Sequence, residues 1–316
     1  MTSEMKRIEF RIPISPTPHF FSLVRFFNFA LRRLEGAHYK RARLTIVVGD
    51  HCDIDAVRRE NRWSEAFDIV WERVPDEIFA EFHWAGTANW RLALPAERAD
   101  IIVLSDADTV LLRNIDPLIA EWPSARPALR GHMAHFPPTL PPTSAAPKAT
   151  SAEFWPWLFG EFGIDWPDEV FPYSIDADRA LPRAPAYFNL GFVALDAAAR
   201  DILGRVIAET TRQLSALIGE SFMRCQIALT IAAYRSGAID IATLPPEYNA
   251  ANDAAHLDLH KLSAAHIRVL HFLRSNEIDR AEFQLDRLDA MLARPVTNPA
   301  NLALQRLAQE YRDSLG

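Results

Sequence analysis

A short apolar run that ends at two aspartates constrains this chain most. Residues 101–104 read Ile-Ile-Val-Leu, and Asp106 and Asp108 follow directly after Ser105. An uninterrupted aliphatic run predicts a strand buried on both faces, as in parallel sheets. In an open α/β sheet, ligands bind beyond the carboxyl ends of such strands. Two carboxylates at that place need a cation, a donor network or a reaction to offset their desolvation.

The segments before and after this run alternate between strand and helix patterns. Apolar residues at every second position predict a strand over 8–14, and helical spacing follows over 20–34. With a further strand over 44–48, this order predicts a doubly wound α/β fold. Asp116 and Pro117 are expected to be the N-cap and first residue of a helix. The other expected elements are strands over 67–70, 187–195, 239–244 and 267–272, and helices over 197–217, 223–233, 278–292 and 301–315, with 76–90 helical or irregular.

Prolines and aromatic residues are dense between residues 122 and 186, which predicts an irregular insertion with short helices. This stretch holds a second Asp-x-Asp, formed by Asp176 and Asp178. No buried strand precedes it, so a surface loop is expected there.

Composition narrows the classes of partner and the compartment. The net charge of −7 argues against a nucleic acid as the main partner. No run approaches the ~18–20 apolar residues of a membrane-spanning helix, and the N-terminus lacks a signal core. Cys52 and Cys225 have no CxxC neighbour and are expected to be ordinary thiols. A cytoplasmic location is expected, and peripheral attachment to a membrane stays open.

Asp106 and Asp108 are two residues apart, so on an extended or turning segment both can face one ligand. Carboxylate oxygens suit hard divalent ions such as Mg²⁺ and Mn²⁺. A metal held there could bridge a diphosphate and neutralise a departing phosphate. A plain turn pair after a strand is the alternative, and the two residues alone leave both open.

Several stretches, in this order, resemble nucleotide-sugar glycosyltransferases of the GT-A fold, and most closely the glycogenin-like family-8 group. Residues 88–92 and 101–118 resemble the metal-binding region of that group. Residues 187–192 resemble its Phe-Asn-x-Gly strand, 244–249 its Leu-Pro…Tyr-Asn segment, and 269–272 its late strand with a histidine. The resemblance implies a single Rossmann-like GT-A domain, with a mixed, mostly parallel central sheet flanked by helices.

The same resemblance implies how the chain is divided. A GT-A domain is expected over 1–275, with a nucleotide-binding half over 1–120, the insertion over 122–186 and an acceptor half over 187–275. A helical extension follows over 276–316. Its helices could pack on the core, form a homodimer or touch a membrane, and core packing is the default expectation.

Carried over position by position, the resemblance implies that Asp106, Asp108 and His271 hold Mn²⁺ or Mg²⁺. Mn²⁺ accepts an imidazole ligand more readily than Mg²⁺ does. Without the family, His271 on an apolar strand is more often a satisfied core histidine. The donor would contact the two aspartates and Ile12, Ser15, Thr17, Arg91, Ala107, Asn189, Gly191 and Arg274.

The activity implied is transfer of a sugar from a nucleoside-diphosphate sugar, with UDP expected, to a hydroxyl acceptor. The acceptor is a glycan, a lipid-linked compound or a small molecule. The group is hexosyltransferase-like and retains the anomeric configuration. Catalytic roles are expected for Arg91, Asn189 and Gln226; since an amide is a poor nucleophile, Asn189 and Gln226 would orient groups and supply polar stabilisation.

Three positions depart from the family pattern. Where the family has an Asp-Gln pair, the chain has Cys225 and Gln226. Where it has a Gly and then a Lys after the late histidine, the chain has Arg274 and Glu277. These departures put the sugar identity and the diphosphate contact in doubt.

Three competing functions remain open. Residues 103–110 also resemble the first motif of haloacid-dehalogenase-type phosphatases, and 49–55 their later Gly-Asp motif, but the order is inverted. A sugar nucleotidyltransferase would need a Gly-rich basic loop, which 12–20 lacks. A non-catalytic nucleotide-sugar-binding protein is the third alternative, because of Arg274 and Glu277.

Overall fold

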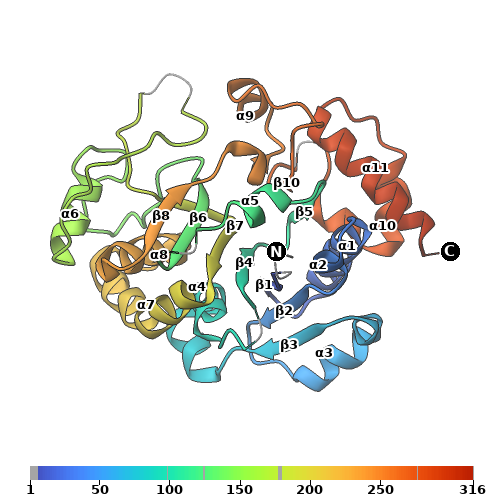
Figure 1. Cartoon of the computed structure of the whole chain (residues 1–316), viewed down its shortest axis with the longest axis horizontal. Helices are drawn as coiled ribbons and strands as arrows, with labels where there is room; N and C mark the ends of the chain where they lie inside the picture. Colours follow the sequence, from blue (N-terminus) through green and yellow to red (C-terminus); the bar gives the residue numbers. More distant parts are fainter. Residues whose placement is uncertain (1–5, 98, 124, 177–179, 276, 316) are drawn as a thin grey trace.

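The computed structural model describes residues 6–97, 99–123, 125–176, 180–275 and 277–315. A central sheet of seven strands has the order β3-β2-β1-β4-β7-β6-β8 (Figure 1). Neighbouring strands are parallel except at β7, which is antiparallel to both β4 and β6. The mixed, mostly parallel sheet is as expected. Its strands are β1 Ile8–Ile14, β2 Arg43–Val48, β3 Ile69–Arg73, β4 Ile101–Ser105, β6 Ala128–Met133, β7 Phe188–Asp196 and β8 Asp240–Thr243.

A second, small sheet lies beyond the carboxyl end of β4. Its order is β5-β10-β9, with β10 antiparallel to β5 and parallel to β9. Its strands are β5 Thr109–Leu111, β9 Ala250–Ala251 and β10 Val269–His271. The chain therefore passes from the main sheet into the small one within the segment that holds Asp106 and Asp108.

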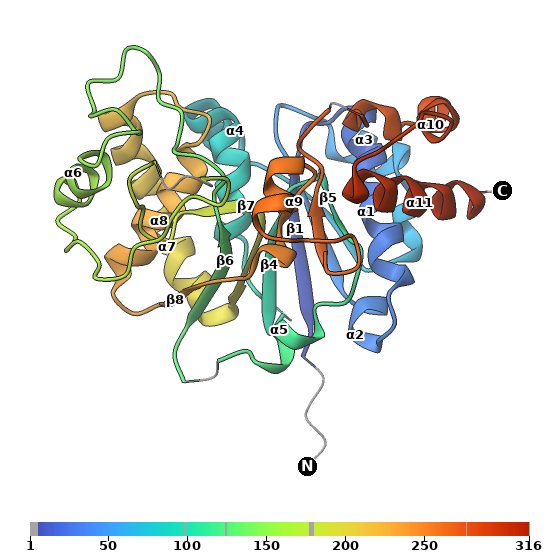
Figure 2. The same cartoon turned by 90° about the horizontal axis from the view of Figure 1, so that it is seen from above.

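Helices cover both faces of the main sheet. Figures 1 and 2 show α4, α7 and α8 on one side and α1, α10 and α11 on the other. The α-helices are α1 Pro18–Arg33, α2 Ala37–Lys40, α3 Ile54–Glu60, α4 Asp76–Ala93, α5 Asp116–Ala120, α6 Phe154–Glu161, α7 Ala197–Ile218, α8 Arg224–Ser236, α9 Ala254–Leu259, α10 Leu285–Leu292 and α11 Pro299–Asp313. Three 3₁₀ helices are η1 Arg62–Ala66, η2 Pro246–Tyr248 and η3 Arg280–Phe283. Among the described helices, none is long and apolar enough to cross a membrane.

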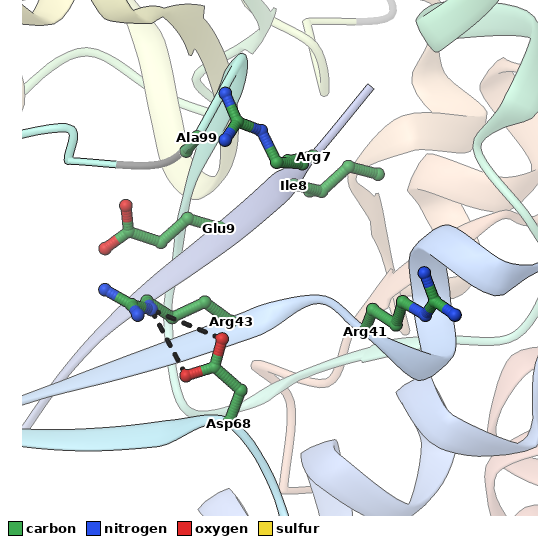
Figure 3. A pocket seen from close by; sticks show the side chains of 7 residues that line it. All are labelled: Arg7, Ile8, Glu9, Arg41, Arg43, Asp68 and Ala99. Atoms are coloured by element: carbon green, nitrogen blue, oxygen red, sulfur yellow. Dashed lines mark hydrogen bonds and ion pairs between the residues drawn. The ribbon is translucent and has the colours of Figure 1, made fainter. Parts of the chain in front are cut away.

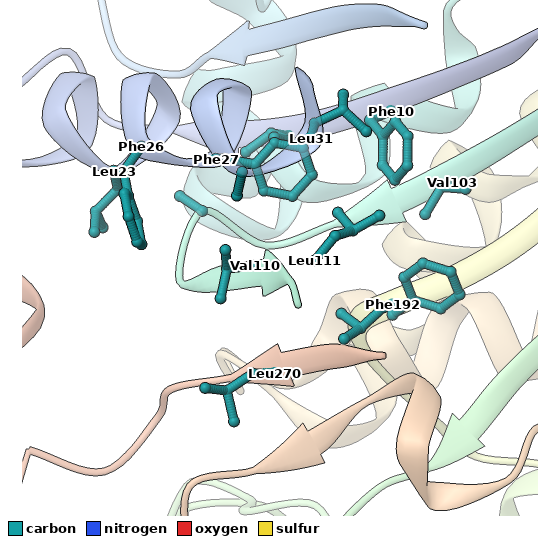
Figure 4. Close-up of a cluster of buried hydrophobic side chains, with 14 of the residues drawn as sticks. Phe10, Leu23, Phe26, Phe27, Leu31, Val103, Val110, Leu111, Phe192 and Leu270 are labelled. Atoms are coloured by element: carbon teal, nitrogen blue, oxygen red, sulfur yellow. The ribbon is translucent and has the colours of Figure 1, made fainter. Parts of the chain in front are cut away.

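Strand β4 is buried on both faces, as its composition predicts. Ile101 and Val103 belong to the hydrophobic cluster beneath α1, whereas Ile102 and Leu104 belong to the cluster beneath α7 and α8. Figure 4 shows the first cluster, in which α1 packs over Val110 and Leu111 of β5, and Val103 lies beside Phe10 of β1. The end of β4 is thus held between two packed layers.

The C-terminal helices share the core of the N-terminal half. The ring of Phe26 on α1 lies 4.6 Å from that of Phe283 and 5.4 Å from that of Tyr311, measured between centroids. Leu288 and Leu304 are fully buried in the same cluster. These helices pack on the core, which was the default expectation.

The range 122–186 is less irregular than expected, because β6 lies within it and forms part of the main sheet. Arg130 and His132 interrupt the apolar pattern of this strand in the sequence, and both side chains form polar contacts in the structure. The Arg130 side chain pairs with Asp240, and Nδ1 of His132 contacts the Leu244 carbonyl at 3.0 Å. Gly131 is needed because a Cβ there would lie 2.6 Å from the Phe188 ring.

Three smaller expectations are corrected. Ile115, not Asp116, is the N-cap of α5; Asp116 instead accepts a hydrogen bond from the Tyr39 hydroxyl at 2.6 Å. The strand expected over 67–70 begins at Ile69, because Phe67 ends η1. The helix expected over 278–292 is broken at Gln284 into η3 and α10.

Replacing Phe283 by Ala is expected to lower the free energy of unfolding by about 3–5 kcal/mol, because the ring is fully buried against Phe26. Leu285→Ala is the matched control: that side chain is 48% exposed, so a change within about 0.5 kcal/mol is expected. Chemical denaturation followed by circular dichroism measures both. Equal stabilities of the two variants would show that the C-terminal helices contribute little to the core.

Candidate functional site

Asp106 and Asp108 lie in the tight turn that joins β4 to β5. The Thr109 backbone N–H and hydroxyl both donate to the Asp106 carbonyl, at 3.3 and 2.8 Å. Ser105 pairs with Phe192 in β7, so residues 189–191 extend past the end of β4 beside the turn. Both carboxylates therefore lie at the carboxyl end of the central strand.

The small sheet brings His271 to this turn from far along the chain. The antiparallel register of β5 and β10 places His271 opposite Thr109, and Phe272 N–H donates to the Asp108 carbonyl at 3.0 Å. Nε2 of His271 lies 3.2 Å from Asp108 Oδ1 and 3.9 Å from Asp106 Oδ2. One potential ligand atom from each of these three residues lies within 4.8 Å of the others.

The tautomer of His271 follows from its second contact. Nδ1 lies 3.1 Å from Oδ1 of Asn249, whose Nδ2 donates to Asn189. Since that amide oxygen accepts, Nδ1 carries a proton, and Nε2 faces the two carboxylates. A proton on Nε2 or a metal ion between the ring and the carboxylates satisfies this arrangement, and a histidine whose outer nitrogen donates in this way is typical of metal ligands. The three residues fit a divalent metal ion.

Gly191 makes this placement of His271 possible. A Cβ at residue 191 would lie 2.2 Å from His271 Nδ1 and 2.8 Å from Asn249 Oδ1. Only glycine lets β7 pass this close to the imidazole ring. A glycine within a strand suggests such a close backbone approach, and it is found here.

Two arginines reach the carboxylates from opposite sides. Arg91 on α4 is fully buried; its Nη1 donates to the Ser105 carbonyl at 2.9 Å and lies 3.6 Å from Asp106 Oδ1. Nη2 of Arg91 has no hydrogen-bond partner among the described residues. Arg280 on η3 has its Nη1 2.5 Å from Asp108 Oδ2, and its side chain is 44% exposed. Arg91 therefore supports Asp106 from the interior, and Arg280 faces the solvent side.

The two aspartates differ in protonation behaviour. Burial acts to raise the pKa of Asp108, but His271 and Arg280 outweigh it and lower that pKa to about 2. Desolvation raises the pKa of Asp106, in spite of Arg91 and His271. Arg91 and Arg280 therefore place two positive charges beside the two carboxylates. A bound divalent ion would add further positive charge to this site.

The residues expected at the nucleotide differ in accessibility. Ile12 is fully buried in the core and Ala107 is also buried, so neither side chain is open to a ligand. Ser15 is half-buried and Thr17 is exposed, between the end of β1 and the start of α1. Asn189 uses Oδ1 to accept from Asn249 and from Gly191 N–H, and its Nδ2 is unused among the described residues.

Gln226 and Arg274 are engaged within the protein. Oε1 of Gln226 accepts from Leu190 N–H at 3.1 Å, and its Nε2 donates to the Tyr187 hydroxyl at 3.2 Å. Arg274 pairs with Asp253 at 2.8 Å, away from the site carboxylates. Gln226 thus holds β7 in position.

Glu277, at the family's lysine position, anchors the start of α11. It accepts from the Thr297 hydroxyl at 2.6 Å and from Asn301 Nδ2 at 2.9 Å. These hydrogen bonds outweigh desolvation and lower its pKa to about 2. Arg280, three residues after Glu277, supplies a positive charge next to Asp108. No sequence motif predicted this residue.

His19, at the start of α1, was also missed by sequence reasoning. Its Nδ1 is buried with no hydrogen-bond partner among the described residues. Burial and then Arg280 lower its pKa, whereas Asp279 and Asp108 act in the opposite direction. His19 therefore lies close enough to sense the charges of the site, although no pattern in the sequence marks it.

Two other features are separate from this site. Asp176 accepts from the backbone N–H groups of Ala180 and Leu181, both at 3.0 Å, and Asp178 lies outside the described residues. Figure 3 shows a cavity of about 100 Å³ at the amino ends of β1 and β2, where Arg43 pairs with Asp68. Parallel strands bind ligands at their carboxyl ends, so this cavity lies at the wrong end of the sheet.

No family model and no curated protein matches the chain. Among solved structures, the apo structure of the bifunctional glycosyltransferase WbbM is similar, with a TM-score of 0.53 and 14% identity. The match covers 97% of this chain and 52% of that one, so the chain spans about half of WbbM. Apo mouse xyloside xylosyltransferase 1 matches with a TM-score of 0.49 and 14% identity, over 85% of this chain and 98% of that one. The fold is the GT-A fold of glycosyltransferases.

Gly191→Ala is expected to weaken Mn²⁺ binding about 10–100-fold, because the new methyl group would displace His271 and its Asn249 support. Gly160→Ala on α6 is the matched control, since a Cβ there meets nothing within 4 Å. Electron paramagnetic resonance of free Mn²⁺ during a titration measures both affinities. An unchanged affinity in Gly191→Ala would remove His271 from the ligand set.

Proposed function

We propose that this chain is a metal-dependent glycosyltransferase. It would transfer a sugar, of hexosyl type, from a UDP-sugar to a hydroxyl acceptor with retention of the anomeric configuration. The observation that carries the proposal is the direction of His271 Nε2, which faces Asp106 and Asp108 at the carboxyl end of β4 in a GT-A fold. The choice of UDP, hexosyl transfer and retention rests on the sequence resemblance.

The charges of the site favour a nucleoside diphosphate. Asp106, Asp108 and His271 would hold a divalent ion, Mn²⁺ or Mg²⁺, which when bound stabilises the charge that develops on the diphosphate leaving group. Asp108 presents Oδ1 to His271 and Oδ2 to Arg280, so a metal ligand and the Arg280 contact use different oxygens. Arg91 and Arg280 offset the two carboxylate charges. The positive charge added by the ion therefore complements the diphosphate.

Each remaining residue has a role in the transfer. In that step the acceptor hydroxyl oxygen bonds to the anomeric carbon, the bond from that carbon to the diphosphate breaks, and the hydroxyl proton passes to the leaving diphosphate oxygen. Arg280 would donate to the leaving diphosphate, in place of the lysine of the family pattern. Asn189 offers an unused Nδ2 to the sugar, while Arg91 positions Asp106. Gln226 acts as a positioning residue through Leu190. The acceptor class stays a glycan, a lipid-linked compound or a small molecule.

The test is UDP release and sugar transfer with a panel of nucleotide sugars and Mn²⁺. Chelation with EDTA is expected to abolish turnover, and added Mn²⁺ to restore it. Asp106→Asn is expected to lower kcat/KM by about 10²–10³-fold, because the ion that stabilises the leaving group is lost. Asp176→Asn, in the other Asp-x-Asp, is the control and should keep wild-type turnover.

Other outcomes of this assay would contradict the proposal. Phosphate release from monophosphate esters without a nucleotide would indicate a phosphatase. Formation of a nucleotide sugar from a sugar phosphate and a nucleoside triphosphate would indicate a nucleotidyltransferase. Binding of a UDP-sugar without turnover, with every acceptor and with water, would indicate a non-catalytic binding protein.

Arg280→Gln is expected to lower kcat/KM for the donor by about 10²-fold, and Arg280→Lys is expected to recover part of that loss. The reason is that the Arg280 guanidinium lies 2.5 Å from Asp108 and is partly exposed, so it can contact a bound diphosphate. Arg287→Gln on α10 is the control, because Arg287 is also exposed and lies close to Arg280 in the sequence. Steady-state kinetics with varied donor measures each variant. Equal constants for Arg280→Gln and Arg287→Gln would contradict the role.

A further inference from the structure

Four histidines gather between β6 and α9, outside the site described above. His132 and His135 come from β6 and the residues just after it; His256 lies on α9, and His260 is the C-cap residue of that helix. The ring centroids of His256 and His260 are 4.7 Å apart, and that of His256 lies 5.8 Å from His132 and 5.2 Å from His135. One ring nitrogen from each of His132, His256 and His260 lies within 4.8 Å of the others.

Several nitrogens of this cluster are buried without partners. Nε2 of His132, Nε2 of His135 and both ring nitrogens of His256 have no hydrogen bond among the described residues. His132 and His135 are each 5% exposed, and His256 is fully buried. A buried polar atom without a partner is costly, and unpaired atoms gathered at one place call for a common ligand.

The outer hydrogen bonds fix two of the rings. Nδ1 of His132 faces the Leu244 carbonyl at 3.0 Å, and Nε2 of His260 faces the Ser174 carbonyl at 2.7 Å. A carbonyl oxygen only accepts, so each of these nitrogens carries the proton and the other nitrogen of each ring has a free lone pair. A metal-bound histidine is held in the same way, by an outer N–H that donates to a carbonyl.

The rings of His132 and His256 are uncharged near neutral pH. Burial lowers the pKa of His132 to about 4 and that of His256 to about 3, and the neighbouring histidines add to this effect. The neutral form of imidazole is the one that binds metal ions. His132 and His256 therefore need no deprotonation to bind a metal.

We propose that His132, His256 and His260 form a second metal site, for a transition metal of the Zn²⁺ class. Three imidazoles and no carboxylate suit Zn²⁺, Cu²⁺ or Ni²⁺, whereas Mg²⁺ and Ca²⁺ require oxygen ligands. The Asp106–Asp108–His271 site has the opposite preference, because oxygen ligands dominate it. The two sites thus select different ions.

The site would fasten α9 to the central sheet. This helix has only six residues and follows Asn252 and Asp253, which both contact Arg274, at 2.8 Å each. So short a helix is marginal without tertiary support. A metal shared by α9 and β6 would fix the segment that carries these contacts, independently of any glycosyl transfer.

The test uses full-length protein that carries Asp106→Asn and Asp108→Asn, so that the first site does not bind the probe. Titration with Co²⁺ is expected to give one equivalent with strong visible absorption, because Co²⁺ with few nitrogen ligands absorbs far more than hydrated Co²⁺. Zn²⁺ should displace it and raise the melting temperature. Adding His256→Ala should weaken Co²⁺ binding at least 100-fold.

His260→Asn is the second variant, because His260 is only half-buried and its replacement disturbs the core least. It too should lose the absorption and the Zn²⁺-dependent rise in melting temperature. His266→Ala, which removes an exposed histidine nearby, is the control and should keep both. Failure of the Asp-substituted protein to bind Co²⁺, or equal binding by His256→Ala, His260→Asn and His266→Ala, would overturn the proposal.

Discussion

The desolvation of two carboxylates at the end of a buried strand is the constraint on which the rest of the site depends. Asp106 and Asp108 follow directly after β4, and no side chain on β4 carries a charge that offsets theirs. Arg91, Arg280 and His271 do so from α4, η3 and β10. Each of these is held in turn by further contacts, such as the hydrogen bond between His271 and Asn249. The charge balance therefore joins both halves of the chain around one turn.

The sequence could predict those parts of the fold and site whose signal is local. The strand over 101–104 is recognisable because all its side chains are apolar, and the position of Asp106 and Asp108 follows from where that run ends. His271 is different, because an isolated apolar strand with one histidine does not reveal its partner. The resemblance to a family supplied the link, and the register of β5 against β10 explains it physically.

Features that arise only from tertiary packing could not be predicted. Arg280 reaches Asp108 because Phe283, on the same 3₁₀ helix, packs against Phe26 and sets the place of η3. Strand β6 could not be predicted because Arg130 and His132 interrupt its apolar pattern. The partners of these two polar residues lie in or next to β8, far along the chain. His132 and His135 form one closely spaced pair in the sequence, and His256 and His260 form another. Nothing in the sequence showed that the two pairs lie next to each other in the fold.

The contact between Asp108 and Arg280 joins residues 172 positions apart, and that separation has a consequence for synthesis. At roughly 5–20 residues per second, the ribosome makes Arg280 about 10–30 s after Asp108. Until then β4 ends in two carboxylates without their later partners, and the small sheet lacks β10. The nascent chain can therefore build most of its main sheet before the site exists, and the site is completed only after Arg280 is made.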